Sequence, residues 1–439
     1  MKVLKFGGTS VGSAQRMKEV AKLITDGEQK IVVLSAMSGT TNTLVEISDY
    51  LYKKNPEGAN EIINRLEAKY KQHVNELYST DEYKQKTQEF IKAQFDYIRS
   101  YTKDIFTLFE EKVILAQGEL ISTNMVTNYL QEQGVNAILL PALEFMRTDK
   151  NSEPDPVYIK EKLAAQLEIH PDAEIYITQG FICRNAYGEI DNLQRGGSDY
   201  TASLIGAAVN ASEIQIWTDI DGMHDNDPRI VDKTSPVRHL HFEEAAELAY
   251  FGAKILHPTC VQPAKYANIP VRLLNTMEPT APGTLISNDT EKGKIKAVAA
   301  KDNITAIKIK SSRMLLAHGF LRKVFEIFES YQTSIDMICT SEVGVSVTID
   351  NTKHLNEILD DLKKYGTVTV DKEMCIICVV GDLEWENVGF EAKALDAMRD
   401  IPVRMISFGG SNYNISFLIR ECDKKVALQS LSDMLFNGK

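Results

Sequence analysis

Long hydrophobic runs and an excess of basic residues are both missing from this sequence. No apolar run approaches the roughly 20 residues needed to span a bilayer, and Lys5-Phe6-Gly7 interrupts the N-terminus before it can form a secretion signal. Lysine and arginine number 49 against 61 aspartate and glutamate residues, a formal net charge of −12. Because nucleic-acid-binding proteins present a basic face, we expect neither a nucleic-acid nor a membrane partner. A few local cations can still hold a small anionic substrate.

Cysteine is scarce and scattered. The six cysteines are Cys183, Cys260, Cys339, Cys375, Cys378 and Cys422. Cys375 and Cys378 have the spacing of a CxxC motif, but they lie inside an apolar run from Met374 to Val380. We interpret this run as a buried strand rather than as a redox or zinc site. A reduced, cytoplasmic protein fits this pattern best.

The chain also lacks a Walker motif and an EF-hand. Gly7 and Gly12 have the Walker separation, but Ser13 stands where that motif needs its lysine. Lys5 instead precedes the glycines at the end of a short apolar strand, and backbone amides in such a turn bind phosphate oxygens. A turn that merely needs positive φ is the alternative. The acidic residues between 219 and 227 have the wrong spacing for an EF-hand, and no glutamate closes that loop.

What the chain does contain is an alternation of strands and helices. Residues 3–6 and 31–34 are typical of strands and residues 14–24 of an amphipathic helix, which implies a parallel sheet with a right-handed crossover. The polar loops 7–13 and 35–42 then fall at the carboxyl edge of the sheet, where ligands bind. Helical periodicity dominates from residue 45 to about 112, and strand patterns return at residues 137–140, 174–181 and 214–218.

A chain of 439 residues predicts two to four domains. The polar stretch 279–294, which contains Pro and Gly, predicts a domain boundary. Beyond it, short strands and helices repeat a βαββαβ-like scheme twice. The expected elements are strands 304–309, 344–349 and 368–370 with helix 320–330, then strand 375–380, helix 390–398, strands 403–408 and 414–419, and helix 424–435.

A second glycine-rich segment, residues 193–202, opens an apolar helix expected at residues 202–209. Glycines and Ser198 at a helix N-terminus form an anion site from backbone amides and the helix dipole. Arg195 adds a planar fork that suits a carboxylate or a phosphate. Asp199 near the same N-terminus is equally well explained as a favourable cap residue.

Three other segments place polar residues where ligands bind, each with a plain structural alternative. Thr218 and Asp219 end a strand and face the expected crevice, with Arg229 following them, although such Asp-, Asn- and Gly-rich turns are common. Lys254 falls in an Ala-rich helix expected over residues 243–256, where an exposed lysine is the simpler explanation. Glu119 is expected at a loop-to-helix junction, where it is equally well a cap.

Taken together, these segments closely resemble the aspartate kinases (aspartokinases), members of the amino acid kinase family, over essentially the whole chain. The resemblance rests on residues 5–10, 35–42, 118–122, 195–202, 217–219, 227–229 and 251–258. The tail resembles the paired ACT domains that sense amino acids in that family, through residues 319–321 and 336–343. The implied fold is an α/β kinase domain over residues 1–290, a parallel-rich sheet sandwiched by helices. Two ferredoxin-like ACT domains follow over residues 303–371 and 372–439, with residues 294–301 contributing a strand to the second.

The resemblance implies transfer of the ATP γ-phosphoryl group to the β-carboxylate of L-aspartate, the first step of lysine, threonine and methionine biosynthesis, with Mg²⁺ bridging the phosphates. The implied catalytic residues are Lys5, Lys254 and Asp199. The implied ATP contacts are Lys5, Phe6, Gly7, Gly8, Thr218, Asp219, His224, Arg229, Lys254 and Ile255. The implied aspartate contacts are Ser35, Thr41, Glu119, Phe181, Arg195, Gly196, Gly197 and Ser198. Among them, Arg195 would clamp the α-carboxylate and Glu119 would pair with the ammonium.

The resemblance also implies an amino-acid effector, with L-lysine favoured over L-threonine, and a homodimer or homotetramer joined through the ACT domains. The implied effector contacts are Met314, Gly319, Phe320, Leu321, Ser334, Asp336 and Glu342. Two departures bear on these roles: His224 stands where relatives often have a tyrosine against the nucleotide, and Leu316-Ala317-His318 replaces a more polar run of lysine-sensitive relatives. The homoserine dehydrogenase half of bifunctional relatives is not expected.

Two other functions remain open. An amino acid kinase with another carboxylate or phosphate acceptor would share the fold, but Arg195 together with Glu119 fits an α-amino acid rather than a nucleotide monophosphate. A non-catalytic amino-acid sensor would use only the tail, whereas the chain retains Lys5, Lys254 and Asp199 alongside Arg195. A purely structural dimerisation module is the alternative for the tail.

Overall fold

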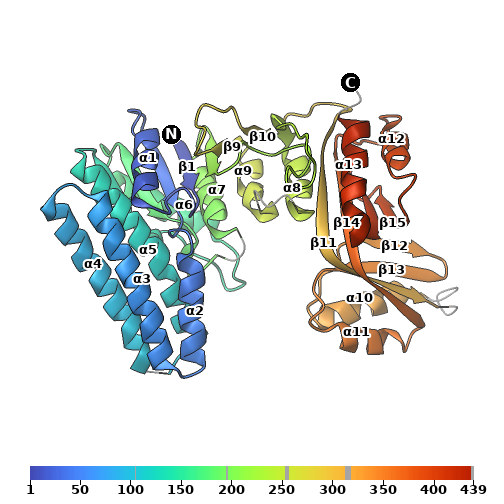
Figure 1. Cartoon of the computed structure of the whole chain (residues 1–439), viewed down its shortest axis with the longest axis horizontal. Helices are drawn as coiled ribbons and strands as arrows, with labels where there is room; N and C mark the ends of the chain where they lie inside the picture. Colours follow the sequence, from blue (N-terminus) through green and yellow to red (C-terminus); the bar gives the residue numbers. More distant parts are fainter. Residues whose placement is uncertain (104, 194–195, 253–256, 312–317, 437–439) are drawn as a thin grey trace. The chain divides into compact units, whose positions relative to one another are not determined.

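The computed structural model spans residues 1–439 and describes all of them except 104, 194–195, 253–256, 312–317 and 437–439 (Figure 1). The chain folds into two compact units: residues 1–223 with 255–288 form the first, and residues 224–254 with 289–439 form the second. The segment 224–254 therefore leaves the first unit in the middle of the sequence and groups with the tail. No helix of the described residues is long and apolar enough to cross a membrane.

A mostly parallel sheet forms the centre of the first unit. Its strands lie in the order β3-β4-β2-β1-β7-β9-β10, and among these only β9 and β10 pair antiparallel. Phe6 in the central strand lies beside Leu34 on one side and Trp217 on the other. The strand bounds are β1 (Lys2–Phe6), β2 (Lys30–Leu34), β3 (Ala137–Leu140), β4 (Ile175–Gln179), β7 (Ile214–Thr218), β9 (Val271–Asn275) and β10 (Thr284–Ser287), with a separate hairpin of β5 (Ile182–Arg184) and β6 (Ile190–Asn192).

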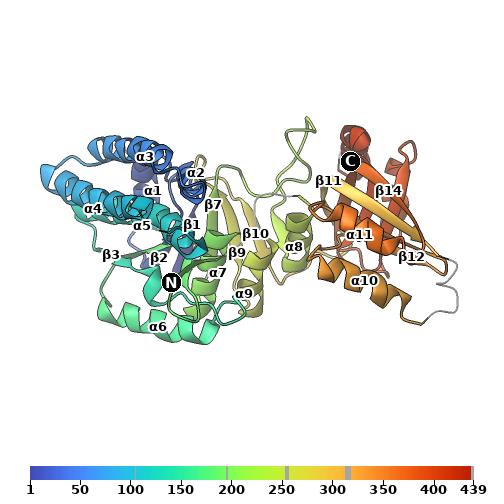
Figure 2. The ribbon, with the colours of Figure 1, turned by 90° about the horizontal axis from the view of Figure 1, so that it is seen from below.

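Helices cover both faces of this sheet (Figure 2). On one face, α5 contacts β2, β3 and β4 and forms a bundle with α2, α3 and α4 (Figure 1). On the other face, α7 contacts β1, β2 and β7, and α6 and α9 pack beside it. Every position of β2 is buried, so apolar helix faces are needed on both sides. The helix bounds are α1 (Ala14–Ile24), α2 (Thr40–Tyr52), α3 (Pro56–Leu77), α4 (Asp81–Ser100), α5 (Leu108–Glu132), α6 (Pro156–Ile169), α7 (Gly197–Ala208) and α9 (Gln262–Tyr266).

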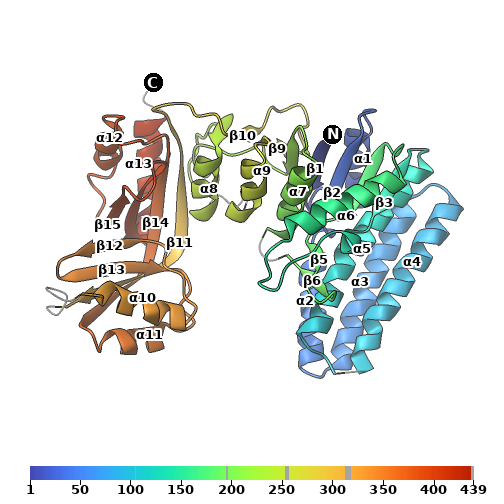
Figure 3. The same ribbon diagram turned by 180° about the vertical axis from the view of Figure 1, so that it is seen from behind.

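An antiparallel sheet in the order β12-β13-β11-β14-β16-β15 forms the core of the second unit. The long strands β11 and β14 pair along their length, with α10 and α11 near one end and α12 and α13 near the other (Figure 3). The strand bounds of this sheet are β11 (Ile295–Lys310), β12 (Ile338–Ser341), β13 (Gly344–Ile349), β14 (Thr367–Gly381), β15 (Val403–Phe408) and β16 (Asn414–Arg420); the short strand β8 (His239–His241) is not part of it. The helix bounds are α8 (Phe242–Tyr250), α10 (Phe320–Ser330), α11 (Leu355–Leu362), α12 (Phe390–Ala397) and α13 (Lys424–Leu435).

The predicted fold class is confirmed, and the structure corrects three details of it. Strands expected at 368–370 and 375–380 are one continuous strand, β14, and β11 is likewise longer than expected. The helix expected over 243–256 ends at Tyr250. Strand β10 falls inside the stretch expected to be a boundary. Cys375 and Cys378 lie buried in a strand, as predicted, and the domain limits at residues 290, 303 and 372 stay predictions.

Candidate active site

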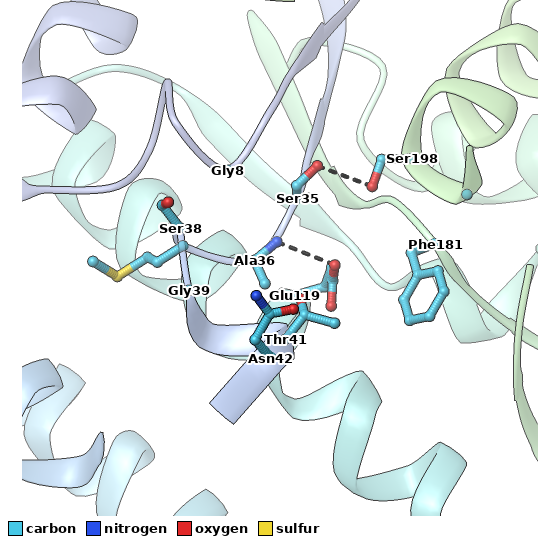
Figure 4. A pocket seen from close by; sticks show the side chains of 12 residues that line it. Gly8, Ser35, Ala36, Ser38, Gly39, Thr41, Asn42, Glu119, Phe181 and Ser198 are labelled. Carbon is cyan, nitrogen blue, oxygen red and sulfur yellow. Dashed lines mark hydrogen bonds between the residues drawn. The ribbon is translucent and has the colours of Figure 1, made fainter. Parts of the chain in front are cut away.

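A pocket of about 320 Å³ lies at the carboxyl edge of the parallel sheet in the first unit (Figure 4). Its walls come from the loops after β1, β2 and β4, from the first turns of α2 and α7, and from the middle of α5. The lining residues are Gly8, Ser35, Ala36, Met37, Ser38, Gly39, Thr41, Asn42, Glu119, Phe181, Gly197 and Ser198. Of the predicted ligand contacts, the pocket brings together Gly8, Ser35, Thr41, Glu119, Phe181, Gly197 and Ser198.

Two helix N-termini open onto this pocket. Helix α2 begins after Gly39, with φ of 81°, and α7 begins after Gly196, with φ of 79°; neither cap residue supplies a side-chain hydrogen bond to the first turn. The first-turn residues of both helices line the pocket. First-turn amides have no partner inside a helix, and the helix dipole adds partial positive charge. The pocket is therefore suited to anionic groups.

Glu119 is the acidic side chain in the same pocket. Its Oε1 accepts a hydrogen bond from the Ala36 amide at 3.1 Å, and its buried Oε2 has no partner among the described residues. Burial raises the pKa of Glu119 to about 8, although the hydrogen bond from Ala36 favours the charged form. A ligand ammonium at Oε2 would supply both the missing donor and a counter-charge.

The structure corrects the expected position of Glu119, which lies in the interior of α5 rather than at a junction. The helix begins earlier because Thr107 and Glu110 form a capping box. Gly118 explains how a helix interior reaches the pocket: a Cβ on it would stand 2.7 Å from the Ala36 Cβ, so only glycine permits this approach. The approach brings the Ala36 amide to the carboxylate of the next residue.

Ser35 and Ser198 join the two sides of the pocket. The Ser35 hydroxyl donates to the Ser198 hydroxyl at 3.0 Å, as Figure 4 shows. Phe181, with φ of 67°, forms the adjacent wall, and its amide donates to Thr201 Oγ1 at 3.0 Å. Both hydroxyls therefore lie on facing segments, where they can donate to one bound anion.

The predicted catalytic pair Lys5 and Asp199 is in direct contact. The Lys5 Nζ lies 2.6 Å from the Asp199 Oδ1, and the two side chains are only 12% and 14% exposed. The Lys5 ammonium also lies against the turn after β1, 3.4 Å from where a Cβ on Gly7 would stand. A largely enclosed cation therefore lies beside the glycine turn that is predicted to bind phosphate, and Asp199 is placed to orient it.

The other residues predicted to contact the nucleotide do not line this pocket. Thr218 ends β7 and its Oγ1 accepts from the Ile220 amide at 3.3 Å, while Asp219 is exposed. His224 and Arg229 belong to the second unit. The Nδ1 of His224 lies 2.9 Å from Thr234 Oγ1, and the Arg229 guanidinium makes hydrogen bonds of 2.9 and 2.6 Å to Asp227.

Several predicted positions lie outside the described residues, namely Arg195, Lys254, Ile255 and Met314. Of the predicted effector contacts, Gly319 precedes α10 with φ of 81°, Phe320 is buried, and Leu321, Ser334 and Glu342 are exposed. Asp336 is buried as a side chain and takes part in an ion pair with Lys301.

Sequence reasoning missed part of the pocket. Ala36, Asn42 and Gly39 were recognised only as members of a polar loop at the right edge of the sheet. Tyr70 was assigned to a helix core, yet its hydroxyl lies 2.9 Å from Thr40 Oγ1 at the first residue of α2. The helical spacing correctly predicts that Tyr70 is buried, but it does not predict that its hydroxyl contacts Thr40.

No group of three or more His, Cys, Asp or Glu side chains that could hold a metal occurs in the part of the chain that the structure describes.

Comparisons with known proteins bear on this site. The model of the amino acid kinase family matches residues 1–275, and an ACT domain model matches residues 377–435. Aspartokinase 1, chloroplastic, of Arabidopsis thaliana is 35% identical over 465 residues, which cover 99% of this chain and 80% of that protein.

Two solved structures of Escherichia coli aspartokinase III are similar along the whole chain. The complex with aspartate and ADP (R-state) has a TM-score of 0.86 and 32% identity, and the match covers 99% of this chain and 100% of that one. The complex with lysine and aspartate (T-state) has a TM-score of 0.82 and 33% identity, covering 99% of each chain.

Proposed function

Because the chain belongs to the amino acid kinase family, and within it to the aspartokinases, we propose that it transfers the γ-phosphoryl group of ATP to the β-carboxylate of L-aspartate. The product is 4-phospho-L-aspartate, and the reaction opens the synthesis of lysine, threonine and methionine. The observation that carries the proposal is the pocket in which two helix N-termini face the buried carboxylate of Glu119.

The charges of this pocket match those of an acidic α-amino acid. The amides at the starts of α2 and α7, with the hydroxyls of Ser35, Thr41 and Ser198, suit carboxylates. Glu119 pairs with the substrate ammonium through the oxygen that lacks a partner among the described residues. Arg195 clamps the α-carboxylate, by analogy with the family. A neutral or cationic ligand would leave the helix amides without a counter-charge.

To catalyse phosphoryl transfer, a protein mainly has to position the two substrates and place positive charge around a loose transition state. Lys5, held by Asp199 at 2.6 Å, supplies such charge beside the turn after β1, and Lys254 supplies a second charge. The substrate carboxylate is already ionised at neutral pH, so no general base is required. Mg²⁺ enters bound to ATP, where it neutralises phosphate charge.

The nucleotide would contact the glycine turn formed by Phe6, Gly7 and Gly8, and the strand end at Thr218 and Asp219. We assign further contacts to His224, Arg229, Lys254 and Ile255 by resemblance. The side chain of Arg229 is bound to Asp227 in this structure, so a contact to phosphate requires it to exchange that partner.

The tail is proposed to regulate the reaction. E. coli aspartokinase III binds lysine in its T-state structure, and this chain carries the ACT match in the corresponding tail. We propose feedback inhibition by an end-product amino acid, with L-lysine favoured and with contacts at Met314, Gly319, Phe320, Leu321, Ser334, Asp336 and Glu342. Pairing of ACT domains into a homodimer or homotetramer, and a cytoplasmic location, complete the proposal.

A coupled assay of ADP release tests the function. The full-length protein should release ADP with ATP, Mg²⁺ and L-aspartate, and should do so far more slowly with L-asparagine, which lacks the β-carboxylate. L-Glutamate, one methylene longer, tests the fit of the pocket. Equal rates with all three compounds, or with none added, would contradict the assignment of the acceptor.

A further inference from the structure

The start of α2, which lines the pocket, has no side-chain cap of its own. Its N-cap, Gly39, supplies no side-chain hydrogen bond to the first turn, whereas a Ser, Thr, Asp or Asn at this position would help to fix that turn. Thr41 and Asn42 of the same turn line the pocket. The orientation of the turn therefore depends in large part on contacts from neighbouring elements.

Helix α3 provides such a contact through Tyr70. The Tyr70 hydroxyl lies 2.9 Å from the Oγ1 of Thr40, the first residue of α2, and both residues are only 1% exposed. Thr40 is also confined by α5, because its Cγ2 lies 3.3 Å from where a Cβ on Gly118 would stand. The residue before Tyr70, Lys69, donates to the Ser38 carbonyl at 3.3 Å. Two successive residues of α3 thus hold the segment that leads into α2.

The ring of Tyr70 is held by the helix bundle, so its hydroxyl has a defined position. Its centroid lies 5.9 Å from that of Phe95 in α4, with 54° between the ring planes. Burial raises the pKa of the Tyr70 phenol, the hydrogen bond with Thr40 lowers it, and the nearby carboxylate of Glu119 raises it. The phenol therefore stays protonated and can bond to Thr40, close to the group proposed to bind the substrate ammonium.

We propose that Tyr70 is a positioning residue for the acceptor amino acid, because it holds Thr40, and with it the first turn of α2, in the orientation that binds a substrate carboxylate. This inference rests on the proposed function and adds to its acceptor site a residue from outside the pocket lining. The first-turn amides and the Thr41 hydroxyl can donate to an anion only when the turn faces the pocket. Without the Tyr70 hydroxyl, the buried Thr40 hydroxyl loses its partner, and the turn shifts to satisfy it elsewhere.

The test removes one hydroxyl at a time from the full-length protein. Tyr70→Phe keeps the ring, Thr40→Val keeps the shape of the side chain, and Thr40→Ser keeps the hydroxyl. Tyr78→Phe is the matched control, since Tyr78 is 3% exposed and donates its hydroxyl to the Met125 carbonyl at 2.7 Å, but does not line the pocket. The measurements are kcat, the KM values for aspartate and MgATP, the Kd of L-aspartate by isothermal titration calorimetry, and the Tm.

Tyr70→Phe should raise the KM and the Kd for L-aspartate about 5-fold, the factor that corresponds to one neutral hydrogen bond. Its kcat and its KM for MgATP should stay within about 2-fold of the wild type, as expected when binding of one substrate alone is weakened. Thr40→Val should have the same effect, and Thr40→Ser should keep most of the wild-type affinity. The double variant Tyr70→Phe/Thr40→Val should bind aspartate no more weakly than either single variant, because both lose the same contact.

Tyr78→Phe separates positioning from stability. It should lower the Tm by an amount similar to that of Tyr70→Phe, because each loses one buried hydrogen bond, but it should leave the affinity for aspartate unchanged. If Tyr70→Phe lowers the Tm but leaves the KM and the Kd for aspartate unchanged, its hydroxyl is only structural and the proposal is overturned. Additive losses of affinity in the double variant would overturn it as well, and Thr40→Val decides the question if Tyr70→Phe does not fold.

The calorimetric Kd separates this proposal from the proposed function. If the wild type phosphorylates aspartate and Tyr70→Phe has the same kinetics, the positioning role fails while the kinase assignment stands. If the wild type binds aspartate without phosphorylating it and Tyr70→Phe still weakens binding, the positioning role stands and the proposed function fails. A wild type that neither binds nor phosphorylates aspartate would overturn both.

Discussion

Glu119 shows how much a single residue determines in this protein. It is a carboxyl group enclosed among α5 and the loop after β2, with one oxygen bound to the Ala36 amide. In the absence of a ligand, burial favours its neutral form. Binding of a substrate ammonium would therefore be accompanied by ionisation of this group.

The pH dependence of stability tests the environment of Glu119. Its pKa is raised to about 8 in the folded protein, against about 4.3 when unfolded, so the native state binds more protons between these values. The free energy of unfolding should consequently fall as pH rises through this window. Glu119→Gln does not show this loss, so at the upper end of the window its free energy of unfolding should exceed that of the wild type by about 4–5 kcal/mol. Urea unfolding at several pH values measures the difference, and parallel curves for the two proteins would show that Glu119 is ionised in the free protein.

Lys5 is the second residue whose role can be isolated. Lys5→Ala should lower kcat about 100-fold while changing the KM for aspartate much less, because its charge matters most when the phosphoryl group detaches. Lys2→Ala is the control on the same strand, since Lys2 forms an exposed pair with Glu28 at 2.8 Å. Steady-state kinetics checks this, and an unchanged kcat would remove Lys5 from the catalytic set.

At the scale of elements, the pocket depends on how closely α5 approaches the loop after β2. Gly118→Ala would place a Cβ 2.7 Å from the Ala36 Cβ and 3.3 Å from Thr40 Cγ2. Alanine is the better helix former by about 1 kcal/mol, but overpacking of this kind costs about 1–3 kcal/mol. We expect a net loss of stability and a raised KM for aspartate.

The control for this substitution is a compensating one. Ala36→Gly in the Gly118→Ala background removes the second methyl group and should restore much of the stability and of the aspartate KM. Thermal unfolding and steady-state kinetics follow the two quantities. If neither the stability nor the aspartate KM recovers in the double variant, the damage lies elsewhere than at this contact.

The elements also show what the sequence can and cannot predict. The strand-helix-strand start and its two polar loops were predictable, because apolar runs, glycines and their order suffice. The interior position of Glu119 was not, because Gln117-Gly118-Glu119 looks like a junction unless the upstream capping box is recognised. The long strands β11 and β14 were divided because polar residues at their irregularities, Asn303 and Glu373, have φ of 59° and 56° and resemble turns. The pairing of β11 with β14 joins residues far apart in the sequence, so no local sequence pattern predicts that each strand continues through its irregularity.

At the scale of the whole molecule, the segment 224–254 leaves one unit and joins the other. Val231 lies buried in the same apolar cluster as Val298 of β11 and Leu428 of α13, and Asn226 donates a side-chain hydrogen bond to the Leu428 carbonyl at 3.0 Å. The segment therefore depends on the tail for burial of its apolar side chains.

Truncation after residue 290 tests this dependence. The shortened chain keeps every described residue of the pocket, yet it loses the residues of the tail that pack against the segment 224–254. We expect it to be inactive, with poor solubility because apolar side chains become exposed. Expression yield, thermal unfolding and ADP release measure the outcome. A soluble, fully active fragment would show that the tail serves regulation or assembly alone.

The most direct test of the central claim is to trap the product. An acyl phosphate reacts with hydroxylamine to give a hydroxamate, so the full-length protein with Mg²⁺, ATP, L-aspartate and hydroxylamine should form L-aspartate β-hydroxamate in step with ADP. Lys5→Ala should form it about 100-fold more slowly. Consumption of ATP without a hydroxamate, or formation of the α-hydroxamate, would contradict phosphoryl transfer to the β-carboxylate.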